Sequence, residues 1–584
     1  MIMYEYLWHI HIADSTMSLL MFTDYCQNIL KVIGSRLVSL RVTLTNVIGG
    51  WSMISSSLRC HLSLSLQRLH LIDIKPYEFD RLLRSHLIKQ IHTLIVDVIN
   101  YSPFEEQTVE GLYLTKVCSQ LPRLTVCQLP FDIFYEKQIQ LDQYSLMPRI
   151  YLPNISNTRH LRKLILGMNS SYFLERLLTC IPLIENLSIG VKDPSIKDKN
   201  YLNIRSSPIN ARFLLYLSTL SINCANNHSF HRSMTILSSI LNQLSHLSLK
   251  LHEYTCISDP LIISSDIIHQ VCLSRLNASA TYDLNLLFRI MCDVEEKRIL
   301  NSFINNLFVY RQQSKIFIQE TNHDDIDSNC HSFIVYTILY NDKKVSSHLL
   351  CRNSQIFSQT TMNSSKLFRH FQEFHLDEFM YNSCFSDLTD CTSLASSMIP
   401  WSLLTKISIC GTDFIKSSLL EAILKTAFNV RTLEISDDTG RLPCMILRNK
   451  NNLGNRINEQ IQSLNIWDCT ITLLNAERFC IRLYNQLPNL KNLTFHIFNS
   501  YYFQEWKPLC VVDGKNKSTI MIVNIIHFIV DKFQELVSFY IYFMRQAQYH
   551  SPCFPHLIRK QLHEQPLSRP YRLRCTDEAI QIWI

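Results

Sequence analysis

The polar segment HDDIDSNCH, residues 323–331, holds side chains of the types that bind transition metals. His323, Asp325 and His331 offer imidazole and carboxylate groups, which are common ligands of zinc and related ions. Their spacing matches no zinc-ligand pattern, because those patterns bring cysteine and histidine together in close pairs. We therefore interpret the segment as a polar loop between two strands, and we predict no metal site.

Other reactive side chains also lack the arrangement that catalysis needs. The segment DVEEKR, residues 293–298, pairs carboxylates at the start of a predicted helix, where acids suit the helix dipole. The sequence contains no GxGxxG, GxxxxGK[ST], GxSxG or HExxH motif, and its 20 cysteines include no CxxC pair. We predict buried, reduced thiols, no catalytic residue, no cofactor and a protein that is not an enzyme.

Composition places the chain among globular proteins. Of its 584 residues, 47% are hydrophobic and 18% are charged, which leaves ample material for a core. The 56 basic and 49 acidic residues give a net charge of +7 over the whole length, too small an excess to indicate a nucleic-acid partner.

Two features argue against secretion and against insertion into a membrane. The first residues, MIMYEYLWHIHIAD, have no basic stretch before the apolar run, unlike a secretory signal. The strongest apolar run, Ile520–Val530, is shorter than the roughly 20 residues that a membrane span requires, so we predict a buried helix there. We expect a cytoplasmic or nuclear protein.

One apolar motif recurs along most of the chain. It reads LxxLxL, with aliphatic or aromatic residues allowed at the apolar positions. Copies begin at Leu37, Leu66, Ile91, Leu121, Leu161, Ile184, Leu217 and Leu244, and again at Phe371, Leu404, Val430, Ile461, Leu490 and Leu536. Many copies follow a helical pattern and a turn, as the helix predicted at 476–487 precedes Leu490. Such recurrence indicates a repeat protein.

The motif predicts a short strand in which the last two apolar residues point to the same side. A single unit cannot bury its apolar face alone, so neighbouring units stack and share one continuous core. Units of helix, turn and strand give parallel strands with right-handed crossovers. We therefore predict an α/β leucine-rich-repeat solenoid, a horseshoe with parallel strands on the concave face and helices on the convex face. Its core should include Leu464, Ile466, Leu493 and Phe495.

The distribution of the motif divides the chain into five segments. We expect a helical lead-in or cap at 1–34, repeats at 35–258 and 401–545, and an irregular cap and tail at 546–584 that ends in a short strand. Residues 259–400 form an irregular α/β segment, interpreted as degenerate repeats, with a separate inserted domain as the alternative. Within it the patterns predict strands at 282–290, 315–320 and 333–338, and a helix at 293–309.

Most of the chain, and most strongly the part after Pro400, resembles F-box/leucine-rich-repeat proteins, in particular a degenerate group of F-box-like chains. The segments PWSLLTKISI (400–409), FNVRTLEI (428–435) and NQLPNLKNLTF (485–495) carry this resemblance. It implies the repeat fold and an adaptor role, because such proteins are the substrate receptors of cullin-RING ubiquitin ligases.

One departure from that family affects the function. An F-box opens near an LPxE motif, which the start of this chain lacks, and residues 1–34 look like the stretch that follows an F-box. We expect a non-enzymatic interaction module that binds the ligase adaptor only if an F-box lies upstream. The alternatives are a ligase receptor with a truncated gene model, and an enzyme with its site in residues 259–400.

The predicted concave face changes character along the chain. The outward position inside the motif is a serine in several repeats, at Ser188, Ser221, Ser248 and Ser408. In the C-terminal repeats this position is occupied by Glu434, Asn465, Thr494 and Tyr540, and the next outward position by Trp467, His496 and Tyr542. Neighbouring strands lie about 4.8 Å apart, so Trp467 and His496 should be adjacent, with Tyr542 one or two strands away.

These seven C-terminal residues are the predicted binding site for a protein partner. Interface hot spots are enriched in tryptophan and tyrosine, whereas small hydroxyls rarely anchor a partner. Two alternatives stay open at this point: the C-terminal tail covers the aromatic side chains, or the register of the strands differs from the one predicted.

Overall fold

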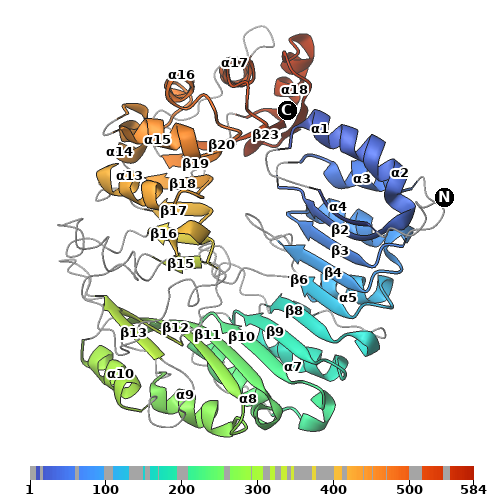
Figure 1. Cartoon of the computed structure of the whole chain (residues 1–584), viewed down its shortest axis with the longest axis vertical. Coiled ribbons are helices and arrows are strands. Elements are labelled where there is room, and N and C mark those ends of the chain that lie inside the picture. Colours follow the sequence, from blue (N-terminus) through green and yellow to red (C-terminus); the bar gives the residue numbers. More distant parts are fainter. Residues whose placement is uncertain are drawn as a thin grey trace.

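Short strands alternate with helices along the chain, and the described elements follow a ring-shaped path (Figure 1). The computed structural model describes residues 8–12, 17–45, 47–59, 65–97, 109–129, 149–150, 158–168, 170–193, 208–255, 263–290, 293–306, 316–321, 331–337, 344–346, 371–376, 400–410, 417–437, 440–449, 452–468, 470–498, 516–543 and 553–584. Within these ranges the strands form two large sheets, with helices mainly along their outer side (Figure 1).

The first large sheet runs from the N-terminus to the middle of the chain. In spatial order, its described strands are β1 (Trp8–Ile12), β2 (Leu37–Thr43), β3 (Arg68–Ile72), β4 (Thr93–Asp97), β6 (Val126–Leu129), β8 (Lys163–Met168), β9 (Asn186–Val191), β10 (Thr219–Cys224), β11 (His246–Thr255), β12 (Thr281–Ile290), β14 (His331–Thr337) and β13 (Ile316–Thr321). All neighbours from β1 to β12 are parallel, and β14 and β13 add antiparallel pairs at the edge. A separate small pair joins β5 (Val109–Glu110) to β7 (Arg149–Ile150).

Helices connect the strands of this first sheet. They are α1 (Leu19–Asp24), the π-helix η1 (Tyr25–Leu30), α2 (Lys31–Ile33), α3 (Gly50–Leu58), α4 (Pro76–Leu83), α5 (Leu112–Gln120), α7 (Ser171–Cys180), α8 (Asn227–Leu237), α9 (Ser265–Val271) and α10 (Asp293–Asn306). Short 3-10 turns precede several strands, as at Leu241–Gln243 before β11. A helix between two consecutive strands returns the chain to the end of the sheet at which the first strand began, which allows the two strands to run parallel.

The second large sheet holds the C-terminal repeats. In spatial order, its described strands are β15 (Lys344–Ser346), β16 (Glu373–Leu376), β17 (Lys406–Cys410), β18 (Thr432–Asp437), β19 (Ser463–Asp468), β20 (Asn492–Ile497), β21 (Ser538–Phe543), β23 (Ala579–Trp583) and β22 (Arg572–Cys575). The connecting helices are α13 (Ser417–Thr426), α14 (Arg441–Leu447), α15 (Leu453–Gln460), α16 (Ala476–Gln486), α17 (Lys517–Lys532) and α18 (Pro555–Glu564). Strands β15 to β21 are parallel, and β23 and β22 pair antiparallel at the edge.

The recurring motif places one layer of apolar side chains in each core. In every predicted copy except the one at Leu121, all three apolar positions are buried. Neighbouring strands pair so that equivalent positions are opposite each other, as Leu464 is paired with Leu433 on one side and Leu493 on the other. The predicted core residues Leu464, Ile466, Leu493 and Phe495 are all buried, which confirms the register of these repeats.

The copy at Leu121 was assigned to the wrong register. The strand there, β6, begins at Val126, and its inward residues are Cys127 and Leu129, which pair with Leu164 and Leu166 of β8. The unit therefore reads Leu124-x-x-Cys127-x-Leu129, three residues later than predicted. A buried cysteine behaves as a small apolar residue, so Cys127 can occupy the middle core position of this unit although the motif was searched with aliphatic and aromatic residues only.

Two terminal segments also differ from the expected helical and irregular structures. Residues 1–34 contain the strand β1 before their helices, and Ile10 and Ile12 of β1 pair with Leu40 and Val42. The C-terminal segment is less irregular than expected, because it holds α18 and the antiparallel hairpin β22–β23. The expected last short strand is present as β23.

The described parts of residues 259–400 agree with the elements predicted there. Strands β12, β13 and β14 and helix α10 lie where the patterns placed them. The strand β12 continues the parallel register of β11, but β14 and β13 run antiparallel and so do not repeat the preceding unit. The predicted buried helix at Ile520–Val530 lies within α17. Among the described helices, none is long and apolar enough to cross a membrane.

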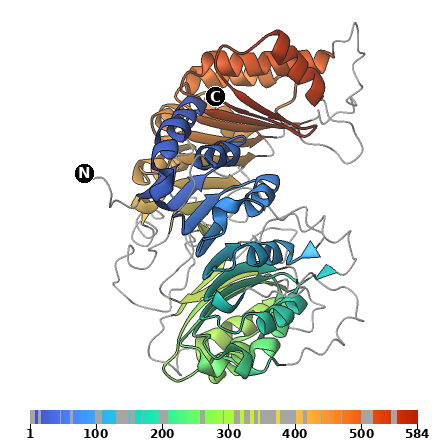
Figure 2. The ribbon, with the colours of Figure 1, turned by 90° about the vertical axis from the view of Figure 1, so that its right-hand side faces the viewer.

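The two ends of the chain meet, and we call their contact the seam. The backbone N–H of Leu19 donates to the carbonyl of Ile584 at 2.8 Å, and the indole N–H of Trp583 donates to the carbonyl of Met17 at 3.1 Å. The Trp583 ring packs edge-on against Phe22, with ring centroids 5.3 Å apart. Trp583 therefore belongs to the core of the N-terminal repeats, and both ribbon views show the C-terminus beside α1 (Figures 1 and 2).

Candidate functional site

A column of stacked aromatic rings crosses three neighbouring strands of the second sheet, and we call it the aromatic column. Trp467 lies on β19, His496 on β20, and Tyr542 and Tyr540 lie on β21. The rings of Trp467 and His496 are stacked at 4.8 Å, those of His496 and Tyr542 at 4.6 Å, and those of Tyr540 and Tyr542 at 4.0 Å. The predicted adjacency of Trp467 and His496 is confirmed, and Tyr542 lies on the next strand.

The aromatic column follows from the regular register of the repeats. His496 is paired directly with Tyr542, and the residues preceding Trp467 and His496, Ile466 and Phe495, are paired in turn. Parallel strands at about 4.8 Å spacing bring equivalent side chains to the separation at which aromatic rings stack. The stacking therefore needs only an aromatic residue at one repeat position in three consecutive units.

His496 is the enclosed member of the aromatic column. The residue is 8% exposed, with Trp467 on one face of its ring and Tyr542 on the other. Within the described part of the chain, its Nδ1 atom has no hydrogen-bond partner. Burial lowers the pKa of His496 to about 4, because the charged imidazolium would lose its hydration. At neutral pH the ring is uncharged, and the column offers π surfaces and not a positive charge.

Trp467 forms the open end of the aromatic column. The residue is 40% exposed, although tryptophan is usually well buried. The residue paired with it on β18 is Ser436, which is too small to cover the second face of the indole. Phe498 contacts the ring only at a tilt, with centroids 6.3 Å apart. A flat or apolar group of a partner can therefore stack on Trp467.

The other predicted site residues, together with Tyr540 of the aromatic column, form a second row on neighbouring strands. Glu434, Asn465, Thr494 and Tyr540 pair with one another across four strands, as predicted. Glu434 is already held, because its carboxylate accepts a hydrogen bond from Ser408 and lies 2.9 Å from the Lys406 ammonium. Glu434 is therefore a weaker candidate anchor than its neighbours.

The C-terminal hairpin extends this face, a contribution that the repeat pattern did not predict. On β23, Gln581 is paired with Tyr540 and Ala579 with Tyr542. The tail thus lies beside the tyrosines, as a further strand, and leaves Trp467 exposed. Burial raises the pKa of Tyr540, and the charges of Arg574 and Glu578 from the hairpin act on it in opposite directions. The antiparallel return of the chain at Asp577 has no counterpart in the LxxLxL pattern.

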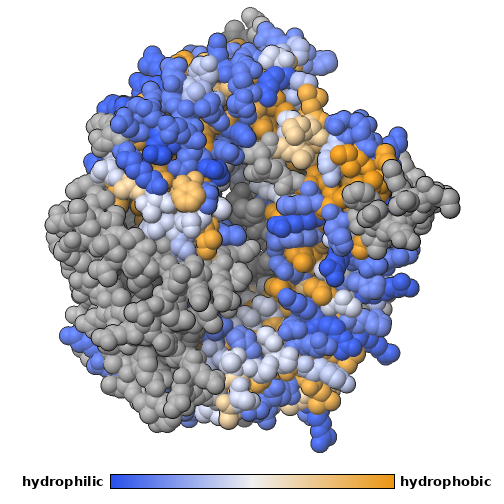
Figure 3. All heavy atoms as spheres, in the orientation of Figure 1, coloured by the Kyte–Doolittle hydropathy of each residue, from blue (hydrophilic) through white to orange (hydrophobic). Residues whose placement is uncertain are grey.

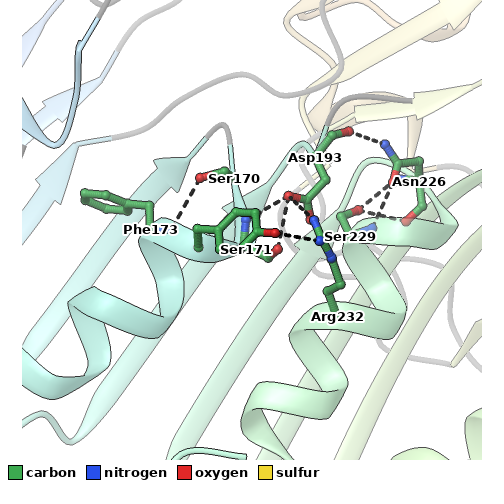
Figure 4. A network of polar contacts seen from close by, with 8 residues as sticks. Ser170, Ser171, Phe173, Asp193, Asn226, Ser229 and Arg232 are labelled. Carbon is green, nitrogen blue, oxygen red and sulfur yellow. Dashed lines mark hydrogen bonds and ion pairs between the residues drawn. The ribbon is translucent and has the colours of Figure 1, made fainter. Parts of the chain in front are cut away.

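A buried polar network around Asp193 is a second candidate, with residue types that occur in catalytic sites (Figure 4). The Asp193 carboxylate accepts hydrogen bonds from the backbone N–H of Ser171 at 2.9 Å and from its hydroxyl at 3.1 Å. Arg232 lies 3.9 Å from the same oxygen, and its guanidinium also contacts the ring and hydroxyl of Tyr172. Burial raises the pKa of Asp193.

The geometry of this network is that of a structural connection between repeats. The Asp193 carboxylate accepts the backbone N–H of Ser171 at the N-terminus of α7. The Asp193 carbonyl accepts from the side chain of Asn226, which forms a capping box with Ser229 at the start of α8. The same use of an acid recurs at Asp437, whose carboxylate accepts the backbone N–H of Leu442 in α14. A repeated capping role explains these buried acids without catalysis.

The predicted polar loop at residues 323–331 lies outside the described residues except for His331, the first residue of β14. In the ranges that the structure describes, no group of three or more His, Cys, Asp or Glu side chains is placed to hold a metal ion. The serines expected on the concave face of the middle repeats do form a row, because Ser221 is paired with both Ser188 and Ser248.

Comparison with known proteins adds no assignment to this geometry. No protein-family model matches the sequence, and a search of curated proteins likewise finds no match.

Proposed function

We propose that this chain is a non-enzymatic scaffold that binds a protein partner on the concave face of a leucine-rich-repeat solenoid. The observation that carries the proposal is the aromatic column with the exposed indole of Trp467 at its open end. Protein interfaces take most of their binding energy from a few such aromatic side chains. A column whose rings already stack on one another loses little conformational entropy when a partner binds.

Two further observations support the leucine-rich-repeat interpretation. Parallel strands in two large sheets line the inner side of the ring, and helices lie outside them (Figure 1). Equivalent motif residues form unbroken rows from strand to strand, as in Phe374, Ile407 and Leu433. This arrangement is typical of solenoids that present an extended concave surface to a partner.

The test is a pull-down with the double variant Trp467→Ala/Tyr542→Ala. The native chain and the variant are each immobilised on beads and incubated with cell lysate. The captured proteins are then quantified by mass spectrometry. We expect proteins that the native chain captures to fall at least tenfold with the variant, because each lost aromatic anchor costs about 2 kcal/mol or more. The matched control is Phe428→Ala, which removes an exposed aromatic ring from the turn before β18.

The outcome separates binding from folding. If the captured set is unchanged while the melting curve is also unchanged, the binding site lies elsewhere. A lower melting temperature and loss of all partners in the double variant, with the Phe428→Ala control unchanged in both respects, would assign the aromatic column a role in stability instead.

A second candidate function is that of a ligase substrate receptor, on the resemblance to F-box/leucine-rich-repeat proteins. The observation that favours it is an apolar surface on the N-terminal helices, where Leu20, Met21 and Val32 are exposed; hydrophobic residues are visible over α1 and α2 in Figure 3. Docking helices that precede the repeats in a receptor would have to pack near this position. Patches of this kind often mark interaction surfaces.

Co-purification distinguishes the two candidates. Because the start of the sequence lacks an LPxE motif, we expect the 584-residue chain not to recover the ligase adaptor. Stoichiometric recovery of adaptor and cullin would favour the receptor role, and its loss in Leu20→Lys/Val32→Lys would place the contact on the N-terminal helices. The control Leu215→Lys changes an exposed leucine far along the chain.

A further inference from the structure

Two cysteine side chains meet beneath the C-terminal hairpin. Cys553 lies two residues before the start of α18, and Cys575 is the last residue of β22. Their sulfur atoms are 3.7 Å apart and both side chains are buried. The structure has both residues as thiols. A disulfide bond is about 2.0 Å long, so the two sulfurs need to approach by less than about 2 Å to form one.

The surroundings make the two thiols chemically different. The Cys553 Sγ atom lies 3.0 Å from the carbonyl oxygen of Thr576, to which it donates while both thiols are neutral. When Cys575 loses its proton, the same S–H group can turn to the new thiolate. This hydrogen bond lowers the pKa of Cys575 and raises the pKa of Cys553. Cys575 is therefore the thiol that ionises first.

The charged groups near this pair act in both directions. The guanidinium of Arg559, on α18, donates to the Cys575 carbonyl at 3.1 Å, and its positive charge favours the Cys575 thiolate. Burial and the nearby Asp577 carboxylate oppose ionisation. A thiolate beside a cation and a second thiol is the arrangement that reactive cysteines use.

We propose that Cys553 and Cys575 are a redox pair that a peroxide converts into a disulfide. The Cys575 thiolate attacks one oxygen of hydrogen peroxide, so that an S–O bond forms, the O–O bond breaks and hydroxide leaves. The sulfur is oxidised and the peroxide is reduced. The Cys553 sulfur then attacks the Cys575 sulfur, the S–S bond forms, the S–O bond breaks, and the hydroxyl group leaves with the Cys553 proton as water. In sum, two thiols and one peroxide give one disulfide and two waters.

The disulfide joins two elements that together support the seam. It ties the start of α18 to the end of β22, and in β22 the Arg572 guanidinium donates to the carbonyl of Ile48 at 3.0 Å. The paired strand β23 carries Trp583, which is buried among the N-terminal repeats. A cross-link at Cys575 therefore restricts opening of the hairpin that holds the two ends of the chain together.

The first experiment is a peptide map of the full chain under non-reducing conditions. The chain is first fully reduced and the reductant is removed. It is then exposed to hydrogen peroxide, blocked with an alkylating reagent and digested. We expect a linked peptide pair that contains Cys553 and Cys575 and that disappears on treatment with dithiothreitol. Cys410 and Cys444 are exposed and report whether the peroxide has reached the protein. The proposal is overturned if these two are oxidised while Cys553 and Cys575 remain alkylated singly, or if Cys575 stops at a sulfinic acid.

The second experiment measures hydrogen exchange in the hairpin. In the oxidised chain we expect the amides of β22 and β23 to exchange roughly 10- to 100-fold more slowly than in the reduced chain. Cys553→Ser and Cys575→Ala should each abolish the difference, whereas Cys480→Ser, at a buried cysteine of α16, should keep it. A linked pair with unchanged hairpin exchange would refute the effect on the seam. Because the native chain alone gives both readouts, the test does not depend on the folding of any variant.

Discussion

Acid should destabilise the C-terminal repeats through one side chain, His496. The pKa of this imidazole falls from its usual 6.5 to about 4 because the ring is buried between Trp467 and Tyr542. The folded chain therefore binds fewer protons than the unfolded chain between these two pH values. The free energy of unfolding therefore has its full value with respect to His496 above pH 6.5, and it decreases as the pH falls towards 4.

The size of the effect follows from the shift itself. Each pKa unit corresponds to about 1.4 kcal/mol, so the difference between 6.5 and about 4 amounts to about 3 kcal/mol of unfolding free energy. Replacing His496 by phenylalanine keeps an aromatic ring between its neighbours and removes the titrating group. The free energy of unfolding of His496→Phe should therefore lose this part of its dependence on pH.

The assay is urea unfolding of both chains, followed by tryptophan fluorescence, at several pH values from 7.5 to about 4.5. We expect the stability difference between His496→Phe and the native chain to grow by about 2–3 kcal/mol in favour of the variant as the pH falls. His563→Phe, at an exposed position on α18, is the matched control and should follow the native chain. A constant difference between His496→Phe and the native chain across this range would refute the argument that burial suppresses protonation of His496.

Three further predictions concern the repeats themselves. Leu464→Ala removes a buried side chain from a fully paired row and should cost about 2–5 kcal/mol in urea unfolding; coincident melting curves of variant and parent would show that the register is wrong. Asn226→Ala removes the cap of α8 and should cost about 1 kcal/mol, and Asn226→Asp should recover part of it. Gly440→Ala should cost about 1–3 kcal/mol, because φ is +67° there and a Cβ atom would lie 2.7 Å from the Thr470 hydroxyl oxygen; an unchanged melting temperature would count against this backbone conformation.

The strands and core of this chain can be predicted because the motif encodes them locally. The spacing of Leu404, Ile407 and Ile409, for example, is the spacing of a short strand whose alternate residues are buried and whose preceding turn is buried as well. The prediction failed at β6 because residues 121–126 happen to satisfy the whole pattern. The true unit starts at Leu124 and has Cys127, a residue outside the apolar set that was counted, at its middle position. An apolar pattern can therefore assign the wrong register where a core position carries a residue outside the counted set and a neighbouring segment matches by chance.

The candidate site was predictable for a related reason. Once the register of β19 to β21 is known, the contact of Trp467 with His496 follows from the strand spacing alone. The burial of His496 does not follow, because the sequence left Tyr542 one or two strands away, and the second face of the imidazole is covered only because Tyr542 lies on the next strand. Nor does the approach of Cys553 to Cys575, since 22 positions and a helix separate them in the sequence.

The meeting of the two ends has its origin in all the repeats and not in any one motif. Each unit adds a small rotation, and the sum of these rotations decides whether the hairpin β22–β23 reaches α1. The hairpin then serves two surfaces at once: on β23, Ala579 and Gln581 are paired with the tyrosines of the aromatic column, and Trp583 is buried beside Phe22 at the seam. Since one strand of five residues carries both sets of contacts, a displacement of β23 changes the candidate site and the closure of the ring together.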